Sequence, residues 1–146
     1  MKHEEVLAAI RDVKDFPVEG IVFKDITTVL SNPEYLKWMK DEIVNLYRAY
    51  GITKVVGIES RGFILGPAVA MDLGAGFVPV RKPGKLPAET IEVSYAKEYG
   101  VDTIQIHADA LSEDDVVLLH DDLLATGGSM AAALELVRKF KVKKVY

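Results

Sequence analysis

The sequence contains no cysteine, which excludes disulfide bonds, thiolate nucleophiles and cysteine-ligated metal sites. It lacks a surplus of positive charge, because the net charge is -4, and this argues against general binding to nucleic acid. No apolar run approaches the roughly 20 residues that span a bilayer, and the amino-terminal segment mixes charged with apolar residues, unlike a secretory signal. These absences predict a cytoplasmic protein that binds neither nucleic acid nor membranes.

What is present suits one folded domain, residues 1–146, because 49% of the 146 residues are hydrophobic. The helical spacing of Val6, Ile10 and Val13 predicts a first helix, and segment 16–25, with its proline and glycine, predicts a loop. A second helix is expected after Asn32 and Pro33, ending at Gly51. Its apolar stripe comprises Leu36, Met39, Ile43, Leu46 and Tyr50.

The rest of the chain alternates short apolar strands with helices. KVVGIESRGFILGPAVAMDLG predicts a strand, a tight turn and a helix, and GFVPVR predicts the next strand, which completes a βαβ unit. IEVSYAKEYG and TIQIHAD predict two antiparallel strands separated by residues 100–102. VVLLH, SMAAALELVRKF and KVKKVY then predict a strand, a helix and the start of a strand. This order indicates an α/β fold with a mostly parallel central sheet flanked by helices and a small antiparallel flap.

Residues 116–129, VVLLHDDLLATGGS, carry the strongest functional signal, because an apolar strand ends in two aspartates and small residues lead into a helix. The small residues are Thr126, Gly127, Gly128 and Ser129. Backbone N–H groups at such a helix start favour a phosphate, and Asp121 and Asp122 are suited to accept hydrogen bonds from sugar hydroxyls. Adjacent glycines without a following lysine match neither the dinucleotide fingerprint nor the nucleotide-triphosphate loop. The alternative is an ordinary turn with Asp122 near a helix cap.

The segment DDLLATGGS resembles the phosphoribosyl pyrophosphate motif of type I phosphoribosyltransferases, and its LLATGG centre is typical of the adenine branch. The resemblance implies that family's fold and the transfer of a 5-phosphoribosyl group from phosphoribosyl pyrophosphate to adenine, giving AMP and pyrophosphate, as in purine salvage. Asp121 and Asp122 would hold the ribose hydroxyls. The residues that would wrap the 5'-phosphate are Ala125, Thr126, Gly127, Gly128 and Ser129. Ser129 stands where the family usually has threonine.

The amino-terminal segment FPVEGIVFKDIT resembles the family's base-binding hood, which residues 1–32 would include. By this resemblance Val22 presents backbone groups to the purine edge and Phe23 packs on the purine face. Taken alone, Phe23 would be read as a core aromatic. Lys24 stands where many members have arginine, which keeps the charge but loses the planar fork.

Two further segments resemble pyrophosphate-binding elements. In GIESRGFILGPA, a strained peptide bond would join Glu59 to Ser60, Arg61 would reach the ligand, and Gly62 would relieve crowding at the bend. In RKPGKLP, three cations would neutralise the leaving pyrophosphate, although a short charge cluster is more often a solvated loop. These cations are Arg81, Lys82 and Lys85.

The segment SYAKEYG resembles a flexible catalytic lid within residues 82–108. Glu98 would exchange a proton with the adenine ring, and Tyr99 would close over the pyrophosphate and exclude water; Arg61 is the third predicted catalytic residue. The family uses Mg²⁺ bound mainly by the substrate, so no protein ligand is assigned to it. The histidines lack the spacing of a metal site and receive no role; they are His3, His107 and His120.

Several alternatives stay open at this stage. The chain could act on another base, such as hypoxanthine, guanine, xanthine or orotate, or could be a non-catalytic module that senses phosphoribosyl pyrophosphate. A sugar hydrolase using Asp121 and Asp122 is disfavoured, because neighbours in an extended chain point to opposite faces. The resemblance further implies a homodimer, and it predicts that the chain is truncated, because family members continue beyond Tyr146.

Overall fold

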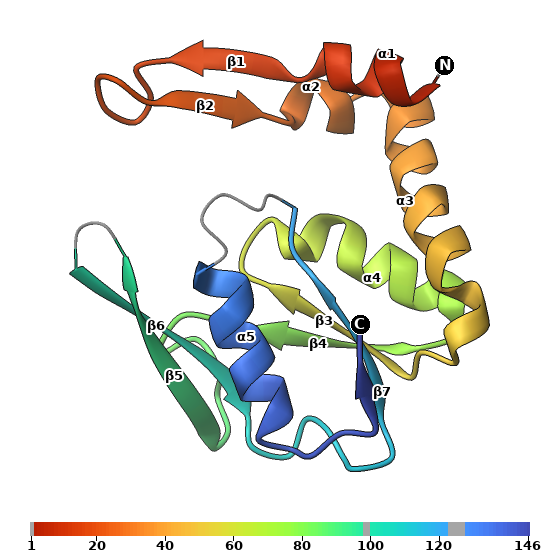
Figure 1. Cartoon of the computed structure of the whole chain (residues 1–146), viewed down its shortest axis with the longest axis vertical. Helices are drawn as coiled ribbons and strands as arrows, with labels where there is room; N and C mark the ends of the chain where they lie inside the picture. The colour runs from red at the N-terminus through yellow and green to blue at the C-terminus, as the bar shows by residue number, and fades with distance from the viewer. Residues whose placement is uncertain (1, 98–99, 123–127) are drawn as a thin grey trace. The chain divides into compact units, whose positions relative to one another are not determined.

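The computed structural model describes residues 2–97, 100–122 and 128–146. Contacts within the chain divide it into two units, Met1–Asn45 and Leu46–Tyr146. Within the described ranges, no helix combines the length and the apolar character that crossing a bilayer would need. The element labels used below are those of Figure 1.

The first unit begins with helix α1 (Lys2–Ala9), followed by the antiparallel strands β1 (Arg11–Lys14) and β2 (Val22–Asp25) and the short helix α2 (Thr27–Leu30). The sequence prediction was wrong here in two respects. Val13 lies in a strand rather than in the first helix, and residues 22–25 form a strand rather than the end of a loop. Cross-strand bonds explain both, because Arg11 Nε donates to Asp25 Oδ2 at 3.0 Å across the hairpin, a contact that helical spacing cannot reveal.

Helix α3 (Pro33–Tyr47) is continued by a 3-10 turn, η1 (Arg48–Tyr50), and Gly51 ends it in the left-handed conformation at φ 67. The predicted helix is therefore confirmed, but its stripe is wrong at two positions. Leu46 is 67% exposed and Tyr50 is 48% exposed. Leu46 lies two residues after buried Val44, which turns it to the opposite side of the helix. Tyr50 lies in η1, where three residues per turn replace the α-helical period.

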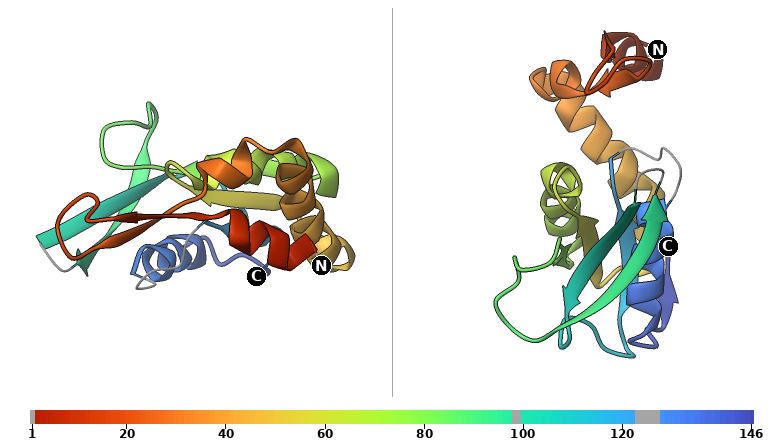
Figure 2. Two further views of the ribbon diagram at one scale, coloured as in Figure 1. Left: turned by 90° about the horizontal axis from the view of Figure 1, so that it is seen from above. Right: turned by 90° about the vertical axis from the view of Figure 1, so that its left-hand side faces the viewer.

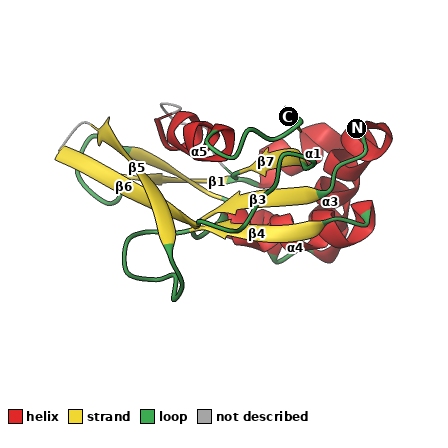
Figure 3. Ribbon diagram, turned by 90° about the horizontal axis from the view of Figure 1, so that it is seen from below, coloured by secondary structure: helices red, strands yellow, loops and turns green. Residues whose placement is uncertain are grey.

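The second unit contains the predicted βαβ unit: β3 (Lys54–Ile58), α4 (Gly62–Leu73) and β4 (Gly76–Val80). Strands β7 (Val116–His120) and β8 (Lys144–Val145) complete a parallel sheet in the order β4-β3-β7-β8. Helix α5 (Gly128–Arg138) lies on one face of this sheet and α4 on the other (Figure 3). Short apolar strands covered on both faces are the usual form of a parallel sheet.

The antiparallel flap consists of β5 (Thr90–Lys97) and β6 (Gly100–His107), and it lies alongside α5 (Figure 2). The predicted break at residues 100–102 was wrong, because Gly100 pairs with Lys97 and Asp102 pairs with Tyr95. Cross-strand pairing thus extends β6 through residues whose own pattern does not alternate. The flap and α5 share the main core. Its fully buried members from these elements and the sheet include Val56, Val80, Ile106, Val117, Ala133 and Leu136.

Candidate active site

The two predicted ligand-binding segments follow neighbouring parallel strands. Gly57 on β3 lies opposite His120 on β7, so the chain after each strand leaves the sheet at the same edge. Asp121 and Asp122 come directly after β7, and residues 59–61 come directly after β3. This edge is the carboxyl end of the strands, where open α/β sheets bind ligands.

Gly62 allows the two segments to approach closely. A Cβ atom at this position would lie 3.1 Å from the carbonyl oxygen of His120, which is tighter than nearly all side chains tolerate. The expectation that Gly62 relieves crowding is therefore confirmed. With the backbones this close, Arg61 Nε reaches within 3.2 Å of Asp122 Oδ2.

Asp121 and Asp122 form a tight local pair. The backbone N–H of Asp122 donates to Asp121 Oδ1 at 2.8 Å. Burial raises the pKa of Asp121 to about 6, and the neighbouring Asp122 carboxyl adds to the rise, although this backbone hydrogen bond and the Arg61 charge oppose it. A carboxyl group with a raised pKa, placed at the carboxyl end of a strand in an open α/β sheet, marks a candidate ligand site.

The Asp122 side chain is largely enclosed, with 8% of it exposed. Its buried Oδ2 atom faces the Arg61 charge, yet the guanidinium N–H does not point along a hydrogen bond to it. The neighbouring His120 Nε2 is also buried without a hydrogen-bond partner among the described residues. Burial lowers the pKa of His120, while the Asp122 charge opposes the shift.

Glu59 lies against the basic loop, residues 81–87, which follows β4. Its carboxylate accepts a hydrogen bond from the Lys82 backbone N–H at 2.8 Å and lies 3.1 Å from Arg81 Nη2 and 2.9 Å from Lys85 Nζ. Burial alone would raise its pKa, but these donors outweigh burial and hold the pKa of Glu59 below its ordinary value. The peptide bond that joins Glu59 to Ser60 is cis. The structure thus brings two of the predicted loop cations, Arg81 and Lys85, to the predicted acidic residue, while Lys82 reaches it only through its backbone.

Asp102 on β6 is a candidate site residue that the sequence did not indicate. Its Oδ2 atom lies 3.5 Å from Lys97 Nζ and 3.9 Å from Lys82 Nζ, and Tyr95 Oη donates to it at 3.4 Å. Burial raises the pKa of Tyr95, and the Asp102 and Asp121 charges raise it further. Strand register was the missing signal, because Asp102 meets Tyr95 only through the β5–β6 ladder.

The predicted base-binding residues lie in the first unit. Val22 is 52% exposed at the start of β2, and Phe23 contacts Phe16 edge to face, with ring centroids 5.2 Å apart. Lys24 Nζ lies 2.6 Å from Asp12 Oδ1 on β1. Phe23 is therefore half-buried against another aromatic ring of its own unit.

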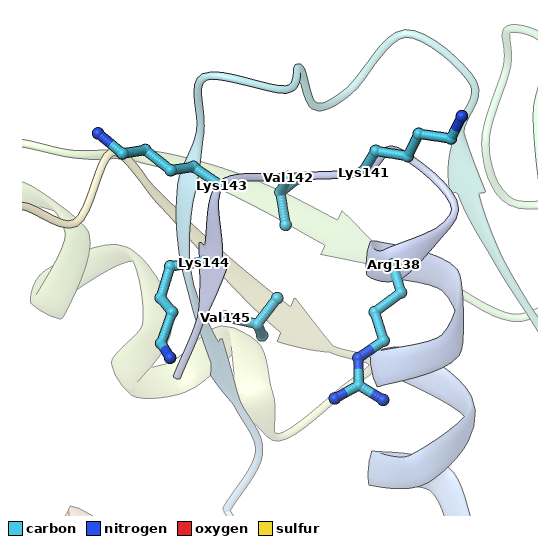
Figure 4. A pocket seen from close by; sticks show the side chains of 6 residues that line it. All are labelled: Arg138, Lys141, Val142, Lys143, Lys144 and Val145. Atoms are coloured by element: carbon cyan, nitrogen blue, oxygen red, sulfur yellow. The ribbon is translucent and has the colours of Figure 1, made fainter.

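Gly128 and Ser129 begin α5, as predicted for a helix start that follows the aspartates. The remaining predicted site residues lie outside the described residues; they are Glu98, Tyr99, Ala125, Thr126 and Gly127. A cavity of about 370 Å³ lies at the other end of α5, between that helix and β8 (Figure 4). None of the predicted site residues that the structure describes lines it. The valines and cationic side chains that line this cavity are therefore separate from the aspartate pair.

Comparison with known proteins shows which family this chain resembles. Residues 25–146 match the family described as phosphoribosyl transferase domain. The chain is 62% identical over 146 residues to the adenine phosphoribosyltransferase of Bacteroides fragilis, covering 100% of this chain and 82% of the relative. The crystal structure of the Rhodothermus marinus adenine phosphoribosyltransferase is 52% identical with a TM-score of 0.92, covering 98% of this chain and 81% of that chain. The Giardia lamblia enzyme complexed with 9-deazaadenine is 46% identical with a TM-score of 0.94, covering 100% and 82%.

Proposed function

Because this chain belongs to the adenine phosphoribosyltransferase family, we propose that it transfers the 5-phosphoribosyl group from phosphoribosyl pyrophosphate to adenine, yielding AMP and pyrophosphate. The observation that carries the proposal is the meeting of two strand ends. Arg61 after β3 lies 3.2 Å from Asp122 after β7, so one compact edge holds a cation beside two carboxylates. That combination suits a ligand with both a sugar diol and a phosphate.

The pair of Asp121 and Asp122 is suited to bind the sugar half of the ligand. Each ionised carboxylate offers only acceptors, and the vicinal hydroxyls of ribose are donors. We assign Asp121 and Asp122 to those hydroxyls, with the 5'-phosphate over the start of α5. The phosphate contacts proposed there come from Ala125, Thr126, Gly127, Gly128 and Ser129. Backbone N–H groups and the positive end of the helix dipole favour an anion at this position.

The Glu59 cluster, which comprises Glu59, Arg81, Lys82 and Lys85, supports binding of the pyrophosphate half of the ligand. Breaking the bond from ribose C1 leaves negative charge on pyrophosphate, and preorganised cations stabilise such charge as it develops. Glu59 holds Arg81 and Lys85 within 3.1 Å and 2.9 Å, and it anchors the backbone of Lys82. We assign these cations to the pyrophosphate, together with Arg61 and the backbone around Ser60.

The choice of base and the proton transfer are assigned from the family resemblance. Val22 and Phe23 recognise the purine edge and face, and Lys24 lies beside them on β2. Glu98 exchanges a proton with the adenine ring, and Tyr99 closes over the pyrophosphate, which keeps water from the sugar cation. These roles are predictions that substitution of each residue tests.

Magnesium enters this proposal as part of the substrate complex. Among the described residues, no group of three or more His, Asp and Glu side chains is placed to hold a metal ion. The cations around Glu59 would repel a bare divalent ion but attract the anionic complex of Mg²⁺ with pyrophosphate oxygens. When bound, the metal neutralises charge on the leaving group. We also propose a homodimer, which light scattering of the purified chain tests.

The test is pyrophosphate release by the 146-residue chain with Mg²⁺ and phosphoribosyl pyrophosphate, offering adenine, hypoxanthine, guanine and orotate in parallel. We expect release with adenine alone. Release only with another base would overturn the adenine assignment while keeping the fold and the phosphate site. A folded chain that binds phosphoribosyl pyrophosphate but releases nothing with any base would favour the sensing module instead. Glu98→Leu should lower turnover more than substrate binding, and unchanged turnover would remove Glu98 from the chemistry.

A further inference from the structure

A second carboxylate gathers cations beside the Glu59 cluster. Asp102 Oδ2 lies 3.5 Å from Lys97 Nζ and 3.9 Å from Lys82 Nζ, and it accepts the Tyr95 hydroxyl at 3.4 Å. The donors come from the loop after β4 and from β5, and they converge on one oxygen atom. Convergent ammonium and hydroxyl donors suit a phosphate oxygen as well as a carboxylate oxygen.

The Asp102 contacts differ from those of Glu59 in strength. The Lys97 and Lys82 side chains are 50% and 56% exposed, and Lys85 is similarly exposed at 51%, but both distances to Asp102 are longer than those that Glu59 makes with Lys85 and Arg81. Exposed ion pairs of this kind contribute little to stability. Glu59 is 9% exposed and also accepts a backbone hydrogen bond, so its partners are held firmly. The lysines on Asp102 are therefore the ones available for exchange.

The charge balance favours an incoming anion. Arg81, Lys82, Lys85 and Lys97 carry four positive charges, and Glu59 and Asp102 carry two negative charges, which leaves a formal excess of two. Lys82 joins the two clusters, because its backbone N–H binds Glu59 and its ammonium faces Asp102. An anion that spans both clusters would meet all four cations.

We propose that Lys97, with Lys82 and the Tyr95 hydroxyl, forms a further phosphate-binding subsite for the pyrophosphate group, and that Asp102 takes the place of the anion until the ligand binds. The inference rests on the proposed function and adds Lys97 and Tyr95 to its binding residues. In the exchange, a phosphate oxygen replaces Asp102 Oδ2 as the acceptor, and no covalent bond changes. Asp102 thereby keeps the two like-charged lysines together and limits the affinity of the site for anions.

The experiment is titration calorimetry of inorganic pyrophosphate with Mg²⁺ into the full chain and its variants. We expect Lys97→Met to raise the Kd about fivefold, because one charged contact to the ligand is lost. Lys97→Arg should stay within about twofold of the parent chain, because the cation is retained. Lys139→Met is the matched control, since this exposed lysine follows α5 and lies outside both clusters. Its Kd should be that of the parent.

The Asp102→Asn variant separates exchange from simple positioning. If Asp102 competes with the ligand, removing its charge lowers the Kd for pyrophosphate, by about threefold for one partly buried carboxylate. A higher Kd in Asp102→Asn would overturn the exchange, and an unchanged Kd in Lys97→Met would overturn the subsite. A parent chain that binds no pyrophosphate would overturn both. Thermal unfolding of each variant verifies that the comparison is between folded chains.

Adenine-dependent turnover, measured on the same preparations, tells the two proposals apart. A parent chain that binds pyrophosphate through Lys97 but has no turnover with adenine would sink the proposed function and leave the subsite standing. Turnover with adenine, together with a Kd for pyrophosphate that is unchanged in Lys97→Met, would support the proposed function and overturn the subsite.

Discussion

Arg61 Nε lies 3.2 Å from Asp122 Oδ2 and joins the loop after β3 to the end of β7. The Asp122 side chain is 8% exposed and that of Arg61 is 40% exposed, so the carboxylate is largely removed from water while its cation still reaches solvent. The pair holds together the segments that we assign to pyrophosphate and to ribose. Its integrity therefore bears on both stability and ligand binding.

Replacing Arg61 by methionine should destabilise the chain and weaken ligand binding together. The Asp122 carboxylate would stay enclosed without its cation, which costs about 1 to 2 kcal/mol for a partly exposed pair. Urea unfolding at pH 7 measures the stability, and titration with phosphoribosyl pyrophosphate measures the binding. Arg61→Lys is the matched control and should recover most of the stability. An unfolding free energy equal to that of the parent in Arg61→Met would show that the pair does not hold the strand ends.

Asp121 should make stability fall as pH rises through the weakly acidic range. Its pKa is raised from 3.8 to about 6 in the folded chain, so between these values the folded state binds more protons than the unfolded state. Asp121→Asn should remove this slope and stabilise the chain at pH 7 by about 1 kcal/mol, because solvent screens this partly exposed group, while weakening phosphoribosyl pyrophosphate binding. Denaturant titrations from pH 4 to pH 7 measure the slope. The exposed Asp109→Asn is the control, and an identical slope in Asp121→Asn would contradict the prediction.

Asp115 should show the opposite pH dependence at the other end of the sheet. Burial raises its pKa, but the Thr53 hydroxyl at 2.7 Å, the Ser112 backbone N–H and Lys54 Nζ at 3.0 Å outweigh burial and lower it. Its contribution is therefore present above the ordinary carboxyl pKa and is lost as pH falls below about 4.

Asp115→Asn should accordingly cost about 2 kcal/mol at pH 7, with the difference shrinking in acid. Chemical unfolding at pH 7 and pH 3 measures the change, and Asp114→Asn, an exposed neighbour, is the control. Pyrophosphate binding should be unchanged, because Asp115 lies before β7 and the ligand site follows it. A cost that is equal at both pH values would show that the charge is not what stabilises this corner.

Gly57 and Gly66 pack against Phe77, and alanine substitutions at these two positions should respond differently to a second substitution, Phe77→Leu. The three atoms nearest to a Cβ at Gly66 would all belong to the Phe77 ring, the first at 2.6 Å, whereas a Cβ at Gly57 would also meet the Gly62 backbone oxygen at 2.8 Å. Each glycine-to-alanine change should destabilise the chain by about 1 to 3 kcal/mol through overpacking. Phe77→Leu should recover most of the loss in Gly66→Ala and little of it in Gly57→Ala. A double-mutant cycle by thermal unfolding measures this coupling, and equal rescue of both would contradict the packing argument.

Local patterns predicted the elements around the site well. Apolar runs located β3, α4, β4 and β7, because a strand covered on both faces needs a continuous apolar segment. The same kind of pattern failed at Val13, where helical spacing competed with a hairpin that depends on partners in β2. It also failed at residues 100–102, where cross-strand pairing with β5 extends β6. In both cases the deciding contacts join residues that are distant in the chain.

By itself, the sequence determined the chemistry available at each segment: the aspartates before small residues, the cations of the basic loop, and the resemblance that identified the family. It could do so because these features lie within short stretches of chain. Only the tertiary structure decided that Arg61 faces Asp122, that Glu59 gathers Arg81 and Lys85, and that Asp102 faces Lys97. Those contacts depend on which strands are neighbours and in which register they pair, and no local pattern of residue types specifies either.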